Sequence, residues 1–321
     1  MVWDGIPWFV ENTAASEETV RLLAEVAASG GEGIAGPADL QVRALAMPGP
    51  AVTVGAGAMV ARRRAAGPGR QSYAARNPTL DQVEIAPTGV DGPRSDLVIA
   101  RIEDPYGGEV WPEPADPLIG PYVWTRVITS VPPGTRSIAD IQPGSTAITL
   151  ARIDLPAKTT AVTAAMITDL RQMAQPRTRT ERVYLHSAWP TPDDLGLLPD
   201  VWEEFPLGAR WELNVPDWAT HVNVHTNMTG LLHPNAAEAR GSIRVTHGAQ
   251  TGTGLPFRIT SPARVTLLAG HNFTVPPTER GTRATVSVQA TTAAGTTGLL
   301  QADNGTALSL EVTYSQAPVS A

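Results

Sequence analysis

The spacing of hydrophobic and polar positions divides the chain into segments with different predicted structures. In residues 16–31 apolar side chains recur every three to four positions, the period of an amphipathic α-helix. Ser16 suits the N-cap, two glutamates occupy the first turn, and Gly30 with Gly31 ends the pattern. The predicted apolar face comprises Val20, Leu22, Leu23, Ala24, Val26 and Ala27.

Short alternating segments separated by Pro- and Gly-rich turns follow this helix and predict strands. The Arg94-Ser95-Asp96 step is typical of a turn that leads into a strand, not of a nucleophile. A second helix is expected at residues 164–175, because apolar residues return to helical spacing there and Pro176 stops it. The predicted strands are residues 40–47, 51–60, 82–86, 96–103, 122–131 and 146–154.

The pattern changes again after Pro176. A polar, Arg-containing stretch at residues 177–182 predicts a linker. From there to the C-terminus only short strand-like segments recur, with turn residues between them, as in a β-sandwich or jelly roll. The chain is therefore predicted to be mainly β. An α+β domain with two helices would span residues 1–176, and an antiparallel β-sandwich or jelly roll would span residues 183–321.

Composition narrows the possible functions. A length of 321 residues fits two domains, and 29 Gly with 29 Pro favour turns and short strands. The net charge of −7 argues against a general nucleic-acid binder. Lys158 is the only lysine and there is no cysteine, so lysine or thiolate chemistry has almost no candidates. We expect no secretory signal and no membrane span, because no basic, apolar leader or long apolar run is present.

The segment from His221 to Asn227 alternates cleanly between apolar and polar residues. Val222 and Val224 would face a core, and the histidines and asparagines would share the opposite face. His221 and His225 would lie about 13 Å apart along a strand, too far to share a metal ion. A solvated face, or a polar face packed against a neighbouring copy, explains them better, and we predict no metal site and no cofactor.

Tryptophans cluster in residues 201–218. Trp202, Trp211 and Trp218 are the candidate ligand-binding residues, because exposed indole rings stack on the apolar faces of sugars. The alternative is that these rings close one end of the core. Acidic pairs occur at Glu103-Asp104, Asp193-Asp194 and Glu203-Glu204, but adjacent acids do not supply the separation that glycoside hydrolysis requires. No phosphate loop, zinc motif or nucleophile elbow is present, so we predict no catalytic residues.

Several stretches of the first half resemble minor tail proteins of tailed phages that infect GC-rich Gram-positive bacteria. The resemblance spans about residues 36–176 and brings no catalytic residues with it. The second half resembles, in architecture only, the variable β-rich module that such proteins carry. The matching stretches are residues 36–50, 52–60 and 85–105, Ser72-Tyr73 with Arg76-Asn77, and residues 167–171.

The resemblance implies a structural, non-enzymatic protein of a phage tail tip or baseplate, assembled in the host cytoplasm into the virion. Its expected partners are other tail and baseplate proteins and further copies of itself, as a homotrimer. The first domain would anchor the protein and the second would contact the host surface. Two alternatives stay open, which are a dedicated glycan-binding adhesion module and a tail-associated cell-wall hydrolase.

Overall fold

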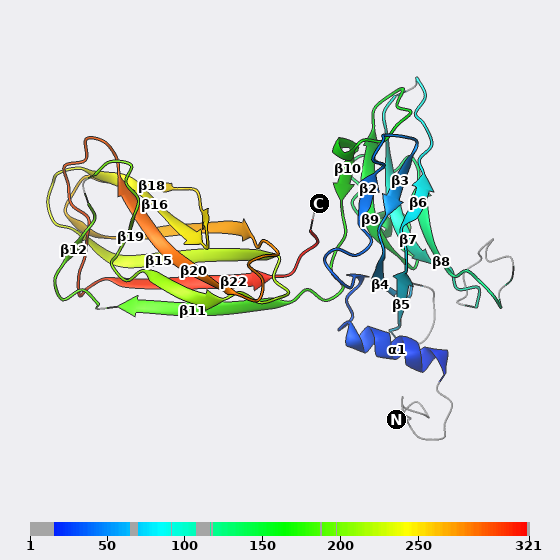
Figure 1. Cartoon of the computed structure of the whole chain (residues 1–321), viewed down its shortest axis with the longest axis horizontal. Helices are drawn as coiled ribbons and strands as arrows, with labels where there is room; N and C mark the ends of the chain where they lie inside the picture. Colours follow the sequence, from blue (N-terminus) through cyan, green and yellow to red (C-terminus); the bar gives the residue numbers. More distant parts are fainter. Residues whose placement is uncertain are drawn as a thin grey trace. The chain divides into compact units, whose positions relative to one another are not determined.

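The structure is a computed structural model, and it describes residues 16–64, 70–90, 92–106, 116, 118–186, 188–196 and 198–319. The chain is mainly β, with antiparallel sheets (Figure 1). It forms two compact units. Unit 1 comprises residues 1–176 together with 317–321, and unit 2 comprises residues 177–316.

The segments that join the units differ from the predicted linker. Residues 178–182 begin strand β11 (Thr178–His186), which pairs with β22 (Ala307–Ser315) along its full length. The linker prediction is therefore wrong for these residues. The chain ends in unit 1 and not in unit 2, because the Val319 amide donates to the Pro37 carbonyl at 3.1 Å.

Three small antiparallel sheets build unit 1. One contains β1 (Gly33–Ile34), β4 (Gly57–Arg62) and β5 (Ser72–Asn77). The second contains β2 (Val42–Ala44), β3 (Ala51–Val54) and β6 (Asp81–Glu84). The third has the order β10 (Ile167–Asp169), β9 (Ala147–Leu155), β7 (Arg94–Ile102), β8 (Val123–Ile128). Their inner faces share a core that includes Val52, Met59, Val98, Leu150 and Ile153.

The first predicted helix is confirmed and the second is wrong. Helix α1 (Glu17–Ala27) begins at Ser16, whose side chain accepts a hydrogen bond from the Thr19 amide at 3.2 Å. In residues 164–175 the structure has a single 3-10 turn, η2 (Ala164–Met166), followed by β10. Pairing of β10 with β9 overrides the helical spacing, because the extended chain also buries Leu170 and Met173. The other short 3-10 helix, η1 (Ile138–Asp140), has a capping box.

Unit 2 consists of two antiparallel sheets. The first has the order β11, β22, β15 (His221–His233), β19 (Ala263–Thr274), and the short strands β21 (Gln301–Ala302) and β12 (Asp193–Asp194) extend it. In the second, β20 (Arg283–Thr292) lies between β16 (Ala239–His247) and the pair β13 (Glu203–Glu204) and β14 (Arg210–Asn214). Strands β17 (Gln250–Thr251) and β18 (Leu255–Ile259) pair with the other edge of β16.

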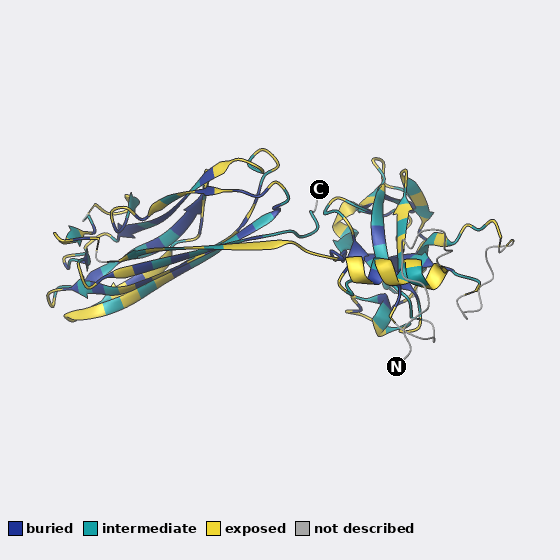
Figure 2. Cartoon of the chain, turned by 90° about the horizontal axis from the view of Figure 1, so that it is seen from below, coloured by how far each residue is buried: buried dark blue, intermediate teal, exposed yellow. Residues whose placement is uncertain are grey.

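Side chains from both sheets of unit 2 fill one hydrophobic core, and Figure 2 colours the buried residues of the chain dark blue. The alternation predicted around His221–Asn227 is confirmed, because Val222, Val224 and Met228 are fully buried while His225 and Asn227 are exposed. One surface of the first sheet of unit 2 therefore faces the core, and the opposite surface is polar. The core also contains Ile243, Val245, Val286, Val288, Leu310 and Val312.

Candidate functional site

Helix α1 packs against β5 with its polar side inward. Glu25 is buried and accepts a 2.6 Å hydrogen bond from the Ser72 hydroxyl, and Arg21 donates to the Gln71 side chain, also at 2.6 Å. The Arg21 guanidinium lies 5.5 Å from the centre of the Tyr73 ring. Polar contacts thus fix the orientation of this helix.

The apolar side of α1 consequently faces outward (Figure 2). Val26 is 66% exposed, and the other three side chains of this face are 41–44% exposed. We call Val20, Leu22, Leu23 and Val26 the α1 face. An amphipathic helix normally turns its apolar stripe toward its own core, and contiguous exposed apolar patches mark interaction sites. Full burial of one such side chain contributes about 1.5–3 kcal/mol, so covering the α1 face would contribute several kcal/mol.

The three candidate tryptophans do not form one surface. Trp211 and Trp218 are partly buried and pack against the core of unit 2. Trp202 lies instead over the outer side of the second sheet, where its ring is 4.0 Å from the guanidinium carbon of Arg244. Arg244 donates to the Gln289 side chain at 2.9 Å, and this hydrogen bond restrains the guanidinium beside the indole. The geometry therefore separates Trp202 from the other two rings.

The polar side of the first sheet of unit 2 contains a hollow of about 430 Å³. Its floor is formed by Ala307 and Ser309 of β22, which runs between β11 and β15. Tyr184 and His186 of β11 form one wall, and Asn227 and Thr229 of β15 form the other. We call these six residues the β22 groove.

Strand register explains the β22 groove. Ser309 is paired with Tyr184 on one side and with Asn227 on the other. Two residues earlier in β22, Ala307 is paired in the same way with His186 and Thr229. Each row of residues paired across the three strands, here called a rung, thus places a small side chain between two larger ones. The two rungs lie on the same face of the sheet, because residues two apart in a strand share a face.

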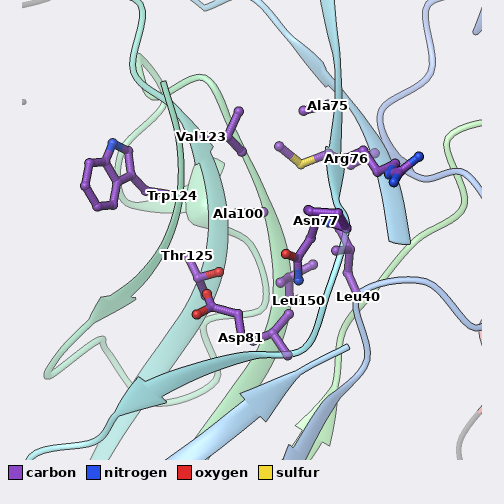
Figure 3. Close-up of a pocket in the computed structure, with 13 residues that line it drawn as sticks. Leu40, Ala75, Arg76, Asn77, Asp81, Ala100, Val123, Trp124, Thr125 and Leu150 are labelled. Carbon is purple, nitrogen blue, oxygen red and sulfur yellow. The ribbon is translucent and has the colours of Figure 1, made fainter. Parts of the chain in front are cut away.

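A second hollow lies in unit 1, and Figure 3 shows its lining. It measures about 180 Å³ and is bordered by residues of β5 and β8. The Asn77 side chain already donates to the Gly55 carbonyl at 3.0 Å, and the indole of Trp124 points away from the hollow and carries Arg126 at 4.3 Å from its ring. Small size and engaged side chains make this hollow a poor ligand site.

The acidic pairs serve the fold. Glu103 is buried and accepts from Arg126 at 3.1 Å, while an Asp193 oxygen accepts from the Leu207 amide at 2.7 Å. Glu203 accepts from the Gly196 amide. Among the described residues no group of three or more His, Asp or Glu side chains could hold a metal ion. Within the same residues, no helix has the length and apolar character needed to cross a membrane.

No protein-family model matches the chain, and no curated protein matches it. Solved structures match it weakly. The infectious bursal disease virus VP2 subviral particle is 12% identical over 94% of this chain and 82% of that chain, with a TM-score of 0.27. The structure of the Gx strain of that virus is 11% identical over 90% of this chain and 80% of that chain, with a TM-score of 0.26. The insecticidal delta-endotoxin Cry8Ea1 from Bacillus thuringiensis is 9% identical over 90% of this chain and 52% of that chain, with a TM-score of 0.22. Such values establish neither a shared fold nor a shared function.

The sequence pattern predicted the apolar stripe of α1 but not which side of the helix packs on the sheets, and it missed the β22 groove. The α1 face was predicted as an apolar stripe, but its outward direction depends on Glu25 meeting Ser72 from a distant strand. The β22 groove depends on three strands whose residues are far apart in the chain. The available signal was the alternation of Tyr184 and His186 with Val183 and Leu185, which places both polar rings on one face.

Proposed function

We propose that the chain is a structural protein of a phage particle, a minor tail protein of the tail tip or baseplate. Unit 1 would anchor it to neighbouring tail proteins, and unit 2 would contact the host surface. A homotrimer is the expected state, since closed symmetry is usual in such assemblies. Assembly in the host cytoplasm would place the protein in the virion.

The observation that carries this proposal is the α1 face. Its apolar side chains are exposed on an element that polar contacts hold in place, so the face is already formed before any partner arrives. A rigid apolar helix face suits a groove or a helix of another tail subunit, with anchors one helical turn apart. Leu22 and Val26 are such a pair.

The topology of unit 2 supports a role in a particle. The orders β11-β22-β15-β19 and β14-β20-β16-β18 correspond to the two four-stranded sheets of a jelly roll. Viral capsid proteins and lectins often use this architecture, although a fold alone does not assign a function. The resemblance of residues 36–176 to minor tail proteins favours the tail over other parts of a particle.

The test uses the phage that encodes the chain. Mass spectrometry of purified particles should detect the protein. A Leu22→Ser/Val26→Ser variant should fold but be incorporated at least about tenfold less, because the buried apolar area is lost. Glu18→Ser is the matched control on an exposed position of the same helix, and it should be incorporated normally. Absence of the protein from particles, or normal incorporation of the double variant, would refute the proposal.

A second candidate is a dedicated adhesion module that binds a cell-surface glycan. Trp202 is the one candidate tryptophan on an outer sheet surface, with Arg244 beneath it, and it favours this alternative. We assign no reaction to the chain, since the acidic pairs hold loops and strands in place. Release of sugar from purified cell wall by the protein would establish the hydrolase alternative instead.

A further inference from the structure

We propose that the β22 groove of unit 2 binds an uncharged saccharide. The site lies on the first sheet and is separate from the candidate tryptophans, since Trp202 stacks over the second sheet and the other two rings pack on the core. It does not depend on the α1 face or on the location of the protein in a particle.

An exposed aromatic ring is the first requirement for sugar binding. Tyr184 is 66% exposed on β11, beside the small Ser309. A tyrosine beside a small residue leaves one side of its ring uncovered, and the apolar face of a pyranose can stack there while the phenolic hydroxyl stays in water.

Free hydrogen-bonding groups are the second requirement. The side chains of His186 and Asn227 are exposed and make no hydrogen bond to any residue that the structure describes. Asn supplies two donors and an acceptor, and neutral His supplies one of each, which matches the mixed character of sugar hydroxyls. The Thr229 hydroxyl donates to the Ala307 carbonyl at 3.3 Å and keeps its acceptor capacity.

The dimensions fit a sugar ring. The two walls are separated by two strand spacings, about 9.6 Å at roughly 4.8 Å each. The side chains on the floor between them are those of Ala307 and Ser309, because the side chain of Leu308, which also borders the hollow, is buried in the core. The two rungs lie about 7 Å apart along the strands. An ion pair between Arg182 and Glu311 (2.7 Å) occupies the next rung and limits the groove at that end.

The charge of the groove selects the ligand class. None of its six residues is acidic or permanently basic, and the nearest charges on the adjoining rung neutralise each other. A polymer that carries phosphate or carboxylate groups would find no unpaired cation in the groove. A neutral oligosaccharide loses little hydration free energy on binding, provided that the groove forms hydrogen bonds with its hydroxyl groups.

The experiment uses the full chain with defined probes. Cellohexaose, maltohexaose and a neutral arabinogalactan oligosaccharide represent the uncharged class, and a glycerol-phosphate oligomer represents the anionic class. Isothermal titration should show binding of at least one neutral probe and none of the anionic one. Tyr184→Ala should weaken binding by about five- to tenfold, and Tyr184→Phe should keep it within about twofold.

Two further variants locate the site. Ser309→Trp should abolish binding by filling the floor, while Trp202→Ala should leave it unchanged. Far-UV circular dichroism and thermal melting check that each variant is folded. The proposal is refuted if no neutral probe binds, if only the anionic probe binds, or if Tyr184→Ala and Ser309→Trp bind normally. It is equally refuted if Tyr184→Ala disrupts self-association of the chain while sugar binding is absent, because the face would then be a protein interface.

Discussion

The buried carboxylate of Glu25 accepts a 2.6 Å hydrogen bond from the hydroxyl of Ser72, and this contact determines which side of α1 faces the sheets of unit 1. The two residues are 47 positions apart, so a long-range polar contact orients a local amphipathic element. The outward direction of the α1 face follows directly from it.

Ser72→Ala should therefore destabilise unit 1 by about 1–3 kcal/mol, because a buried carboxylate loses its donor without regaining water. Urea unfolding followed by circular dichroism measures the change. Thr79→Ala is the control, since Thr79 is exposed in the same unit and its substitution should shift stability by less than about 0.5 kcal/mol. Equal stability of the two variants would mean that Ser72 does not hold α1.

The guanidinium of Arg171 connects three segments of unit 1. Its side chain is fully buried and donates to Asp169 at 2.6 Å, to the Asp39 carbonyl at 2.6 Å and to the Val319 carbonyl at 2.9 Å. Arg171→Met should cost about 3–5 kcal/mol, because the Asp39 and Val319 carbonyls lose this donor and Asp169 keeps only the hydrogen bond from the Arg171 backbone amide.

The control for Arg171 is Arg182→Met in unit 2. Arg182 is 63% exposed and pairs with Glu311, and solvent screens an exposed pair, so its loss should change stability little. Calorimetry of both variants tests the difference, and similar melting temperatures would contradict the role given to Arg171. A chain shortened to residue 316 should lose less stability than Arg171→Met, because it removes only the Val319 carbonyl from the groups that accept hydrogen bonds from the Arg171 side chain.

Local signals in the sequence predicted the elements whose structure depends on neighbouring residues. Ser16 and the glutamates after it identified the start of α1, and the alternation at Val222 and Val224 identified a strand with one buried face. The second predicted helix failed because Leu170 and Met173 also reach the core from an extended chain, which pairs with β9 over Ile167–Asp169 and forms a bridge to Ile34 at Met173.

The remaining features depend on residues far apart in the chain. Strand β11 resembled a linker because it is an edge strand with exposed Thr178, Arg179 and Thr180 at its start. The β22 groove requires the register of Tyr184 against Ser309, which no local pattern contains.

Unit 2 should lose stability as the pH falls below neutrality, and His247 is one cause. Burial lowers the pKa of His247 below its ordinary value, and a backbone hydrogen bond offsets this only in part. The ring lies between Tyr314 (Nε2 to hydroxyl, 3.3 Å), Phe273 and Glu279 (Nδ1 to carboxylate, 3.6 Å). The unfolded chain binds a proton near pH 6.5 while the folded chain does so only at lower pH, so stability falls as the pH drops through this interval.

Urea unfolding at pH 7 and pH 5 measures this effect. The loss of stability between the two pH values should be smaller in His247→Gln than in the unsubstituted chain, whatever the absolute stability of the variant. The same pH dependence in both proteins would show that His247 does not contribute.

Gly230 is required at the bulge that interrupts the pairing of β15 with β19. Its φ is +74°, and a Cβ atom there would lie 2.2 Å from the Gly305 carbonyl oxygen, so both the backbone and the neighbouring turn exclude a side chain.

Gly281, also in unit 2, has a φ of +72°, but the atom nearest to a Cβ at that position would be 3.8 Å away. Gly281→Ala should therefore cost about 1–2 kcal/mol from the left-handed backbone alone. Gly230→Ala should cost at least about 2 kcal/mol more, because a strand or turn must also move. Thermal unfolding of the two variants gives the comparison. Equal losses of stability would show that the turn at Gly305 can move without a measurable energetic cost.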